Sequence, residues 1–232
     1  MHFILFNFHL FLTIFGFRFP LDGILGMGFN DISIPPFMPT VFDEMVNHSL
    51  IDKPIFSVFL SNSHNGSADS VMLFGGIDEK YYQGPLTYYP APLEAFWMIG
   101  IKHISVAGKI VHNCPAGVCA AVLDTGTSII AGPNNVIAPL IVAIGPVFAN
   151  CSNIKSLPPI SFQIGAEAYT ITSDIYVIND PTDGCTLGIE GLPAIEAPFW
   201  ILGDPFLRAF YTVYDRAGKF ARVGIAQARS QL

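Results

Sequence analysis

The feature that most limits the fold of this chain is the spacing of its glycines and prolines. Its 232 residues contain 21 Gly and 18 Pro, and these are spread along the chain rather than gathered in one linker. Because Gly and Pro interrupt regular elements, only short helices and strands fit between them. The distribution therefore predicts an all-β fold with many short strands and a few short helices.

Alternating apolar residues show where several strands lie. Residues 70–77 form a short apolar run that ends in Gly-Gly. Three further segments alternate on both sides of a turn, which is typical of a β-hairpin. These segments are 99–111, turning at Ala107-Gly108, 160–178, turning at Gly165-Ala166, and 210–226, turning at Arg216-Ala217-Gly218.

Two segments have helical patterns. Thr40 can cap a helix over about 40–50, with Asp43 at its third position and Val41, Met45 and Val46 on one face. A shorter helix is expected near 134–143, where Pro139 limits its length.

The composition excludes some classes of protein. Charged residues make up 12% of the chain, about half the usual ~25%, which argues against a disordered, highly charged protein. There are 11 Lys and Arg against 18 Asp and Glu, a net charge of −7, which argues against nucleic-acid binding.

The mean hydropathy of +0.49 is high for a soluble protein, and residues 1–19 contribute to it with seven of the twenty Phe. This segment has no basic start and no Ala-x-Ala cleavage site, and Asn7, His9 and Arg18 interrupt it. Two interpretations stay open: a signal or membrane anchor, and a foreign segment from a mispredicted chain start.

The four cysteines are Cys114, Cys119, Cys151 and Cys185. The absence of Cys-x-x-Cys argues against a zinc site. Three disulfide pairings are possible, and four reduced thiols are the alternative. An even count together with Asn-x-Ser sequons at Asn47, Asn65 and Asn150 favours a secretory route.

One segment gives the strongest indication of chemistry in this sequence. It is residues 120–130, Ala-Ala-Val-Leu-Asp-Thr-Gly-Thr-Ser-Ile-Ile. An apolar strand runs into Asp124 and a tight polar turn, where Gly126 allows close backbone approach. Thr127 and Ser128 can donate hydrogen bonds to the carboxylate, and a carboxylate held in this way suits general acid–base chemistry. An ordinary turn with an Asp at a strand end is the simpler interpretation of Asp-Thr-Gly alone.

This segment resembles the second active-site loop of pepsin-like (pepsin and cathepsin D type) aspartic proteases. Further segments resemble family motifs in the family's order. They are Asp22–Gly28, Phe74–Asp78 followed by Tyr81–Leu86, Trp200–Arg208, Tyr211–Arg216 and Val223–Ala226. The resemblance covers roughly nine-tenths of the chain. It implies one complete β lobe at residues 86–232 and, at 20–85, the end of the N-terminal lobe with the inter-lobe crossing.

The resemblance also implies roles for single residues. Asp124 would be a catalytic carboxylate of an endopeptidase whose two Asp residues activate a water molecule against a peptide bond. The implied supporting residues are Thr125, Gly126, Thr127, Ser128, Leu202 and Gly203. Those implied for substrate binding are Phe96, Val122, Glu190, Leu192 and Ile201, with a core role equally open for Phe96 and Leu192. The family's disulfides imply the pairs Cys114–Cys119 and Cys151–Cys185. No metal or organic cofactor is implied, and the partner is a protein or peptide substrate.

The chain departs from the family in one respect, because it contains a single Asp-Thr-Gly. Neither Asp22 nor Asp31 is followed by Thr-Gly, so neither is a good substitute. The second carboxylate would have to come from a missing N-terminal lobe or a second subunit. The alternatives are a non-catalytic peptide-binding homologue and an inactive truncated fragment.

Asp204 is expected to modulate acidity or to cap the following helix. The low charge suits an extracellular or lysosomal, acidic compartment.

Overall fold

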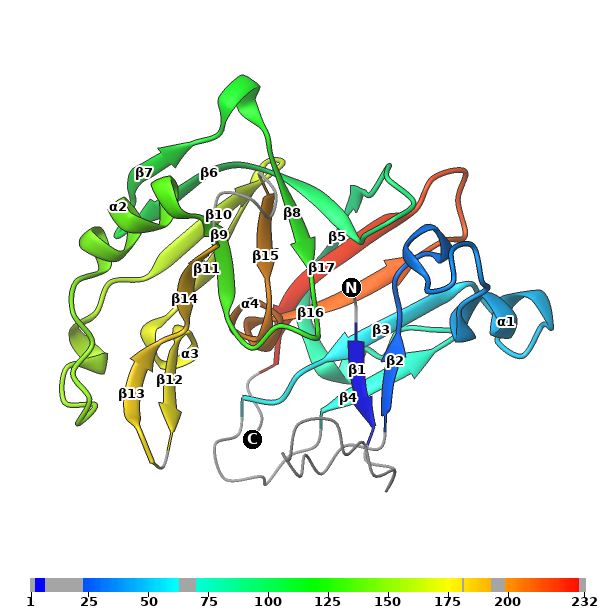
Figure 1. The fold of residues 1–232 in the computed structure, drawn as a ribbon, viewed down its shortest axis with the longest axis horizontal. Coiled ribbons are helices and arrows are strands. Elements are labelled where there is room, and N and C mark those ends of the chain that lie inside the picture. Colours follow the sequence, from blue (N-terminus) through cyan, green and yellow to red (C-terminus); the bar gives the residue numbers. More distant parts are fainter. Residues whose placement is uncertain (1–2, 7–22, 63–69, 181, 193–198, 230–232) are drawn as a thin grey trace.

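The computed structural model describes residues 3–6, 23–62, 70–180, 182–192 and 199–229. Most of the segment 1–19, Asp22 and the sequon at Asn65 lie outside the described residues. Strands dominate, as the glycine and proline spacing predicts (Figure 1). Among the described residues, no helix is both long and apolar enough to cross a membrane.

An eight-stranded sheet contains the Asp124 segment. Its strands run in the order β11-β10-β6-β8-β15-β9-β14, with β7 paired to β6. Their bounds are β6 Met98–Val106, β7 Lys109–Asn113, β8 Cys119–Leu123, β9 Ile130–Pro133, β10 Ile160–Ile164, β11 Glu167–Ile171, β14 Ile189–Leu192 and β15 Phe199–Leu202. The predicted hairpins at 99–111 and at 160–178 are confirmed as the pairs β6–β7 and β10–β11.

A five-stranded sheet joins distant parts of the chain in the order β4-β3-β16-β17-β5. Its strands are β3 Ile55–Phe59, β4 Val71–Phe74, β5 Tyr82–Pro90, β16 Phe210–Asp215 and β17 Arg222–Ala228. The predicted hairpin at 210–226 is confirmed as β16–β17. This hairpin lies between β3 and β5, so the end of the chain completes a sheet that earlier residues began.

The remaining strands of the described part of the chain form two small two-stranded sheets. β1 (Phe3–Phe6) pairs with β2 (Gly23–Gly26), and β12 (Val177–Asp180) pairs with β13 (Gly184–Leu187), each in an antiparallel register.

Within the described residues, four short α-helices connect the strands. They are α1 (Val41–Asn47), α2 (Asn134–Ile144), α3 (Ser173–Tyr176) and α4 (Asp204–Ala209). The capping box predicted for the first is confirmed, because Thr40 Oγ1 accepts from Asp43 N at 3.1 Å and an Asp43 oxygen accepts from Thr40 N at 2.7 Å. The helix ends at Asn47, three residues before the predicted end. The helix predicted near 134–143 is confirmed as α2, which runs through Pro139 and ends at Ile144.

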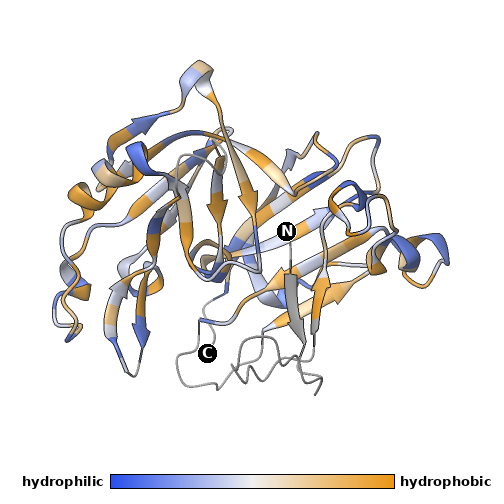
Figure 2. Ribbon diagram, viewed as in Figure 1, coloured by the Kyte–Doolittle hydropathy of each residue, from blue (hydrophilic) through white to orange (hydrophobic). Residues whose placement is uncertain are grey.

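The largest apolar core lies between the two sheets and contains aromatic side chains from both. Phe162 and Trp200 of the eight-stranded sheet and Phe56 and Tyr214 of the five-stranded sheet are at most 1% exposed. Helix α4 contacts strands of both sheets (Figure 1). Apolar segments recur along the strands of both sheets (Figure 2). Burial of these segments makes the main contribution to the stability of the fold.

Both disulfides have the pairing that the resemblance implies. Cys114 is bonded to Cys119, across five residues, and Cys151 is bonded to Cys185, across 34 residues. The first closes the entry to β8, and the second ties β13 to the loop that follows α2.

Candidate active site

Asp124 follows the last residue of β8, at the edge of the core. The residue is 7% exposed, and both of its carboxylate oxygens have a hydrogen-bond donor. Gly126 N donates to Oδ1 at 3.0 Å, and Thr127 Oγ1 donates to Oδ2 at 2.7 Å. Because each oxygen is held by a different donor, the plane of the carboxylate is fixed. Ser128 is exposed and makes no hydrogen bond to this carboxylate, so its expected donor role is wrong.

The strand β15 lies directly behind this loop. It is parallel to β8, with Leu202 opposite Leu123, and antiparallel to β9 on its other side. Leu202 O accepts from Asp124 N at 3.1 Å. β15 thus separates the two strands that flank the Asp124 loop and holds the loop through its backbone.

Gly203 is required where β15 passes the loop. A Cβ atom on this residue would lie 2.2 Å from Thr127 O and 2.3 Å from Ile129 O. Asp204 N donates to the same Thr127 oxygen at 2.9 Å. The backbone therefore approaches the loop too closely for any side chain at residue 203.

Asp204 begins α4 but does not cap it. Gly203 occupies the N-cap position without a side-chain hydrogen bond, so the expected capping role of Asp204 is wrong. Its carboxylate instead lies 3.4 Å from Arg208 Nη2. Burial raises the pKa of Asp204 above its usual range, Arg208 opposes this rise, and the negative charge of Asp124 adds to it.

Four of the residues expected to bind substrate lie on strands of the eight-stranded sheet, and Phe96 lies just before β6. Val122 and Ile201 are opposite each other on β8 and β15, with Val122 only 2% exposed. Phe96 is half-buried, and its ring centroid is 6.2 Å from that of Phe199. Glu190, which is exposed, and Leu192, which is half-buried, lie on β14 opposite Ala131 and Pro133. Thr125 is half-buried beside Asp124.

A model of the eukaryotic aspartyl protease family matches residues 13–228. This chain belongs to the eukaryotic aspartyl protease family. It is 40% identical over 216 residues to pepsin A of Sus scrofa, 38% over 220 residues to cathepsin E of Oryctolagus cuniculus and 36% over 219 residues to cathepsin D of Canis lupus familiaris. Each match covers 89% of this chain, and 54%, 54% and 52% of those proteins respectively. The chain thus spans about half the length of the curated relatives it matches.

Sequence reasoning gave no individual role to two buried tryptophans that lie next to the strands carrying the Asp124 loop. Trp200 is 1% exposed, and the nearest atom of its ring lies 2.7 Å from the position that a Cβ on Gly132 would take. Trp97 O accepts from Leu123 N at 3.0 Å, which anchors the end of β8. A glycine inside the apolar run 129–132 is a signal of close approach that could have indicated the first contact.

A group of potential metal ligands lies near the start of β8. His112, Cys114 and Cys119 offer atoms within 4.8 Å of one another. The two sulfurs are joined in a disulfide, and Cys119 Sγ is 3.5 Å from His112 Nε2. A thiolate binds metal whereas a disulfide sulfur is a poor ligand, so this group is a structural feature.

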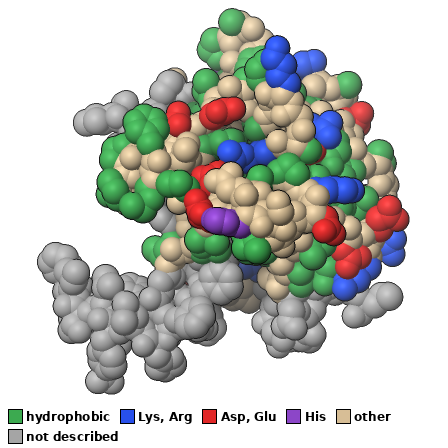
Figure 3. Space-filling model, turned by 90° about the vertical axis from the view of Figure 1, so that its right-hand side faces the viewer, with side chains coloured by type: hydrophobic (Ala, Val, Ile, Leu, Met, Phe, Trp, Pro, Cys, Tyr) green, Lys and Arg blue, Asp and Glu red, His purple; other side chains and the backbone are tan. Residues whose placement is uncertain are grey.

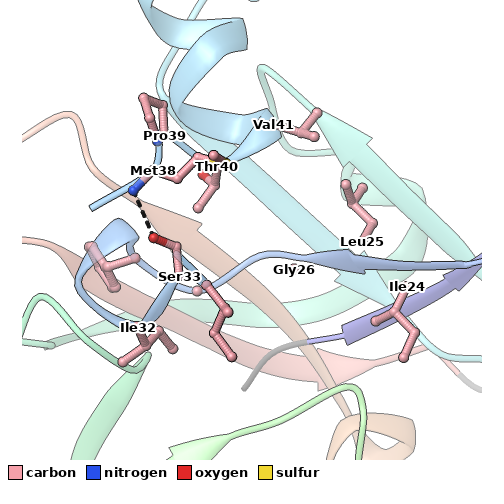
Figure 4. A pocket seen from close by; sticks show the side chains of 12 residues that line it. Ile24, Leu25, Gly26, Ile32, Ser33, Met38, Pro39, Thr40 and Val41 are labelled. Carbon is pink, nitrogen blue, oxygen red and sulfur yellow. Dashed lines mark hydrogen bonds between the residues drawn. The ribbon is translucent and has the colours of Figure 1, made fainter. Parts of the chain in front are cut away.

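An apolar cavity of about 330 Å³ opens beside β2 and α1, with Ile24, Met38 and Val41 in its lining (Figure 4). Ile34 also lines it. All four of these side chains are at least 48% exposed. The face of the molecule on the α1 side also shows apolar side chains among charged ones (Figure 3). Asp124 does not line this cavity.

Proposed function

We propose that this chain is the part of a pepsin-like aspartic endopeptidase that carries one of two catalytic carboxylates, Asp124. The observation that supports this most strongly is that both oxygens of the Asp124 carboxylate accept a hydrogen bond. Gly126 N donates to one oxygen, and Thr127 Oγ1 donates to the other. A carboxylate with a fixed plane can hold a water molecule in a constant orientation. This pre-organisation lowers the barrier to attack on a peptide carbonyl.

The reaction needs a second carboxylate facing Asp124. Two adjacent carboxylates share one proton, because like charges at short distance oppose each other's ionisation. The ionised member takes a proton from the water, and the protonated member donates one to the scissile carbonyl oxygen. The chain has one Asp-Thr-Gly. We therefore assign the second carboxylate to an N-terminal lobe outside these residues or to a second subunit.

In this proposal residues 86–232 are the C-terminal lobe, and residues 20–85 are the end of the N-terminal lobe with the crossing. Thr125 and Ser128 complete the loop that Leu202 and Gly203 support. Protein substrates lie along the residues assigned to substrate binding, namely Phe96, Val122, Glu190, Leu192 and Ile201. The match to only about half of each relative supports the division.

We also propose a secretory route that ends outside the cell or in an acidic, lysosome-like compartment. Two disulfides support an oxidising route of synthesis. The sequons at Asn47 and Asn150 lie on exposed residues, which a glycan requires.

The test is peptide cleavage at acidic pH by the full chain, alone and mixed with the first half of a related pepsin A. We expect cleavage in the mixture, and Asp124→Asn lowers kcat about a thousandfold or more. Asp183→Asn, an exposed residue in the β12–β13 turn, is the matched control and keeps full activity. Equal activity of the Asp124→Asn variant would overturn the assignment. Peptide binding without cleavage in either form would favour the non-catalytic homologue, which the single Asp-Thr-Gly makes the second candidate.

A further inference from the structure

A second cleft lies away from the Asp124 loop, between β5, β17 and β11. Its volume is about 440 Å³, and residues from these strands and from the start of β16 line it. None of its lining residues belongs to segments 124–128 or 199–203. The cleft is therefore separate from the catalytic assignment and goes beyond the proposed function.

The cleft forms where the β5–β17 ladder opens. Ile225 pairs with Thr87 and Gln227 pairs with Gln83, so three residues of β5, 84–86, face the single residue Ala226. Gly84 has a φ of +74°, a conformation that glycine adopts without strain. Extra residues on one strand make it bow away from its neighbour, and the bulge leaves an opening at this edge of the five-stranded sheet.

Two aromatic residues, Tyr169 and Phe210, line part of the cleft, and Tyr89 lies behind Tyr169. Tyr89 of β5 and Tyr169 of β11 share a hydrogen bond of 2.8 Å between their hydroxyl oxygens. Phe210 packs against Tyr169 with ring centroids 5.1 Å apart. Tyr89, Tyr169 and Phe210 are each at most 8% exposed. Buried aromatic residues therefore line this part of the cleft, and its open part carries the exposed residues Gln83, Gln227 and Glu167.

The open part offers groups that suit a peptide backbone. β11 is the terminal strand of its sheet among the described residues, and an edge strand presents unpaired backbone donors and acceptors. Gln83 is exposed, and its side-chain amide can both donate and accept hydrogen bonds. Gln227 is also exposed; its Nε2 donates to Ala209 O at 3.0 Å, and its Oε1 can accept a hydrogen bond from a peptide.

One negative charge, that of Glu167, favours an occupant with a basic side chain. Among the described residues that line the cleft, Glu167 is the single charged one, and it is exposed. It forms no ion pair within the described part of the chain. An occupant with a basic side chain opposite Glu167 would complement this charge.

We propose that this cleft binds an extended peptide segment, which adds as a strand to the free edge of β11. The peptide carries a lysine or arginine beside Glu167. Backbone hydrogen bonds contribute the affinity, and the carboxylate selects the basic side chain. For a protease, such a site would hold a protein away from the bond that is cut.

The test uses the full chain with the Asp124→Asn change, so that no probe is cut. The probes are acetyl-Thr-Val-Lys-Val-Thr-amide and its matched counterpart with glutamate in place of lysine. Two-dimensional NMR follows the side-chain amide signals of Gln83 and Gln227 during titration. We expect saturable shifts of both signals with the lysine peptide and much smaller shifts with the glutamate peptide.

Variants then test the charge. Glu167→Gln weakens lysine-peptide binding about threefold, as an exposed ion pair predicts, and Glu167→Lys reverses the preference between the two peptides. Asp174→Asn, an exposed carboxylate on α3, leaves both affinities unchanged. Equal binding of both peptides to the parent protein, an unchanged preference in Glu167→Lys, or shifts confined to residues 122–128 would each overturn the proposal.

Discussion

Replacing Gly203 by alanine should loosen the Asp124 loop, because the new methyl group meets backbone rather than a side chain. At 2.2 Å from Thr127 O, it would lie more than 1 Å inside the 3.4 Å at which ordinary contact begins. A backbone carbonyl has no other rotamer to adopt. Relief therefore requires β15 and the loop to separate by about 1 Å.

That separation breaks two hydrogen bonds. Asp124 N to Leu202 O is 3.1 Å and Asp204 N to Thr127 O is 2.9 Å, so an extra 1 Å takes both beyond bonding distance. Each loss costs about 1 kcal/mol, and the residual strain costs about 1–2 kcal/mol. The free energy of unfolding should fall by about 3–4 kcal/mol.

Urea unfolding measures this change through tryptophan fluorescence, because Trp97 and Trp200 are both 1% exposed and flank the loop. The matched control is Gly76→Ala, where the new Cβ has only Leu73 Cδ2 at 4.0 Å. It should change the free energy by less than about 0.5 kcal/mol. A Gly203→Ala protein as stable as the control would refute the close-approach argument.

Two further changes test the disulfides and the pH dependence. Replacing Cys151 and Cys185 by serine should lower the free energy of unfolding by about 4 kcal/mol, against about 2 kcal/mol for the Cys114–Cys119 pair. The reason is that the longer loop gains more conformational freedom in the unfolded state when its disulfide is removed. Equal losses of stability in thermal unfolding would contradict this. Burial raises the pKa of Asp43, but hydrogen bonds from Thr40 and the Arg216 ion pair lower it by more, to a value below 3.8. The stability it contributes is therefore present above that pH and is lost as the pH falls through the folded pKa. Asp43→Asn should accordingly destabilise the protein at pH 6 and much less at pH 2 in urea titrations, whereas a difference that does not change with pH would argue against the ion pair.

Local patterns predicted much of the fold. The three hairpins and the capping box of α1 depend on neighbours within a few residues, so alternation and turn residues were enough to find them. The chemical segment was found in the same way, because an apolar strand that ends in Asp-Thr-Gly is a contiguous signal. The same reasoning failed for Asp204 and Ser128. Their roles depend on which groups the folded chain places beside them.

The sequence by itself, through the spacing of neighbouring residues, determined the mainly-β fold class, the turns of the three hairpins and the place of Asp124 at the end of a strand. Only the tertiary structure decided that residues 199–202 enter between β8 and β9, and that β16 and β17 join strands formed more than a hundred residues earlier. The physical reason is that strand partners are chosen by burial and backbone hydrogen bonding across the folded core, which no local window of sequence contains. Gly203 is an example of what only the tertiary structure decides. A side chain is excluded there by the carbonyl oxygens of Thr127 and Ile129, which are more than seventy residues away in the chain.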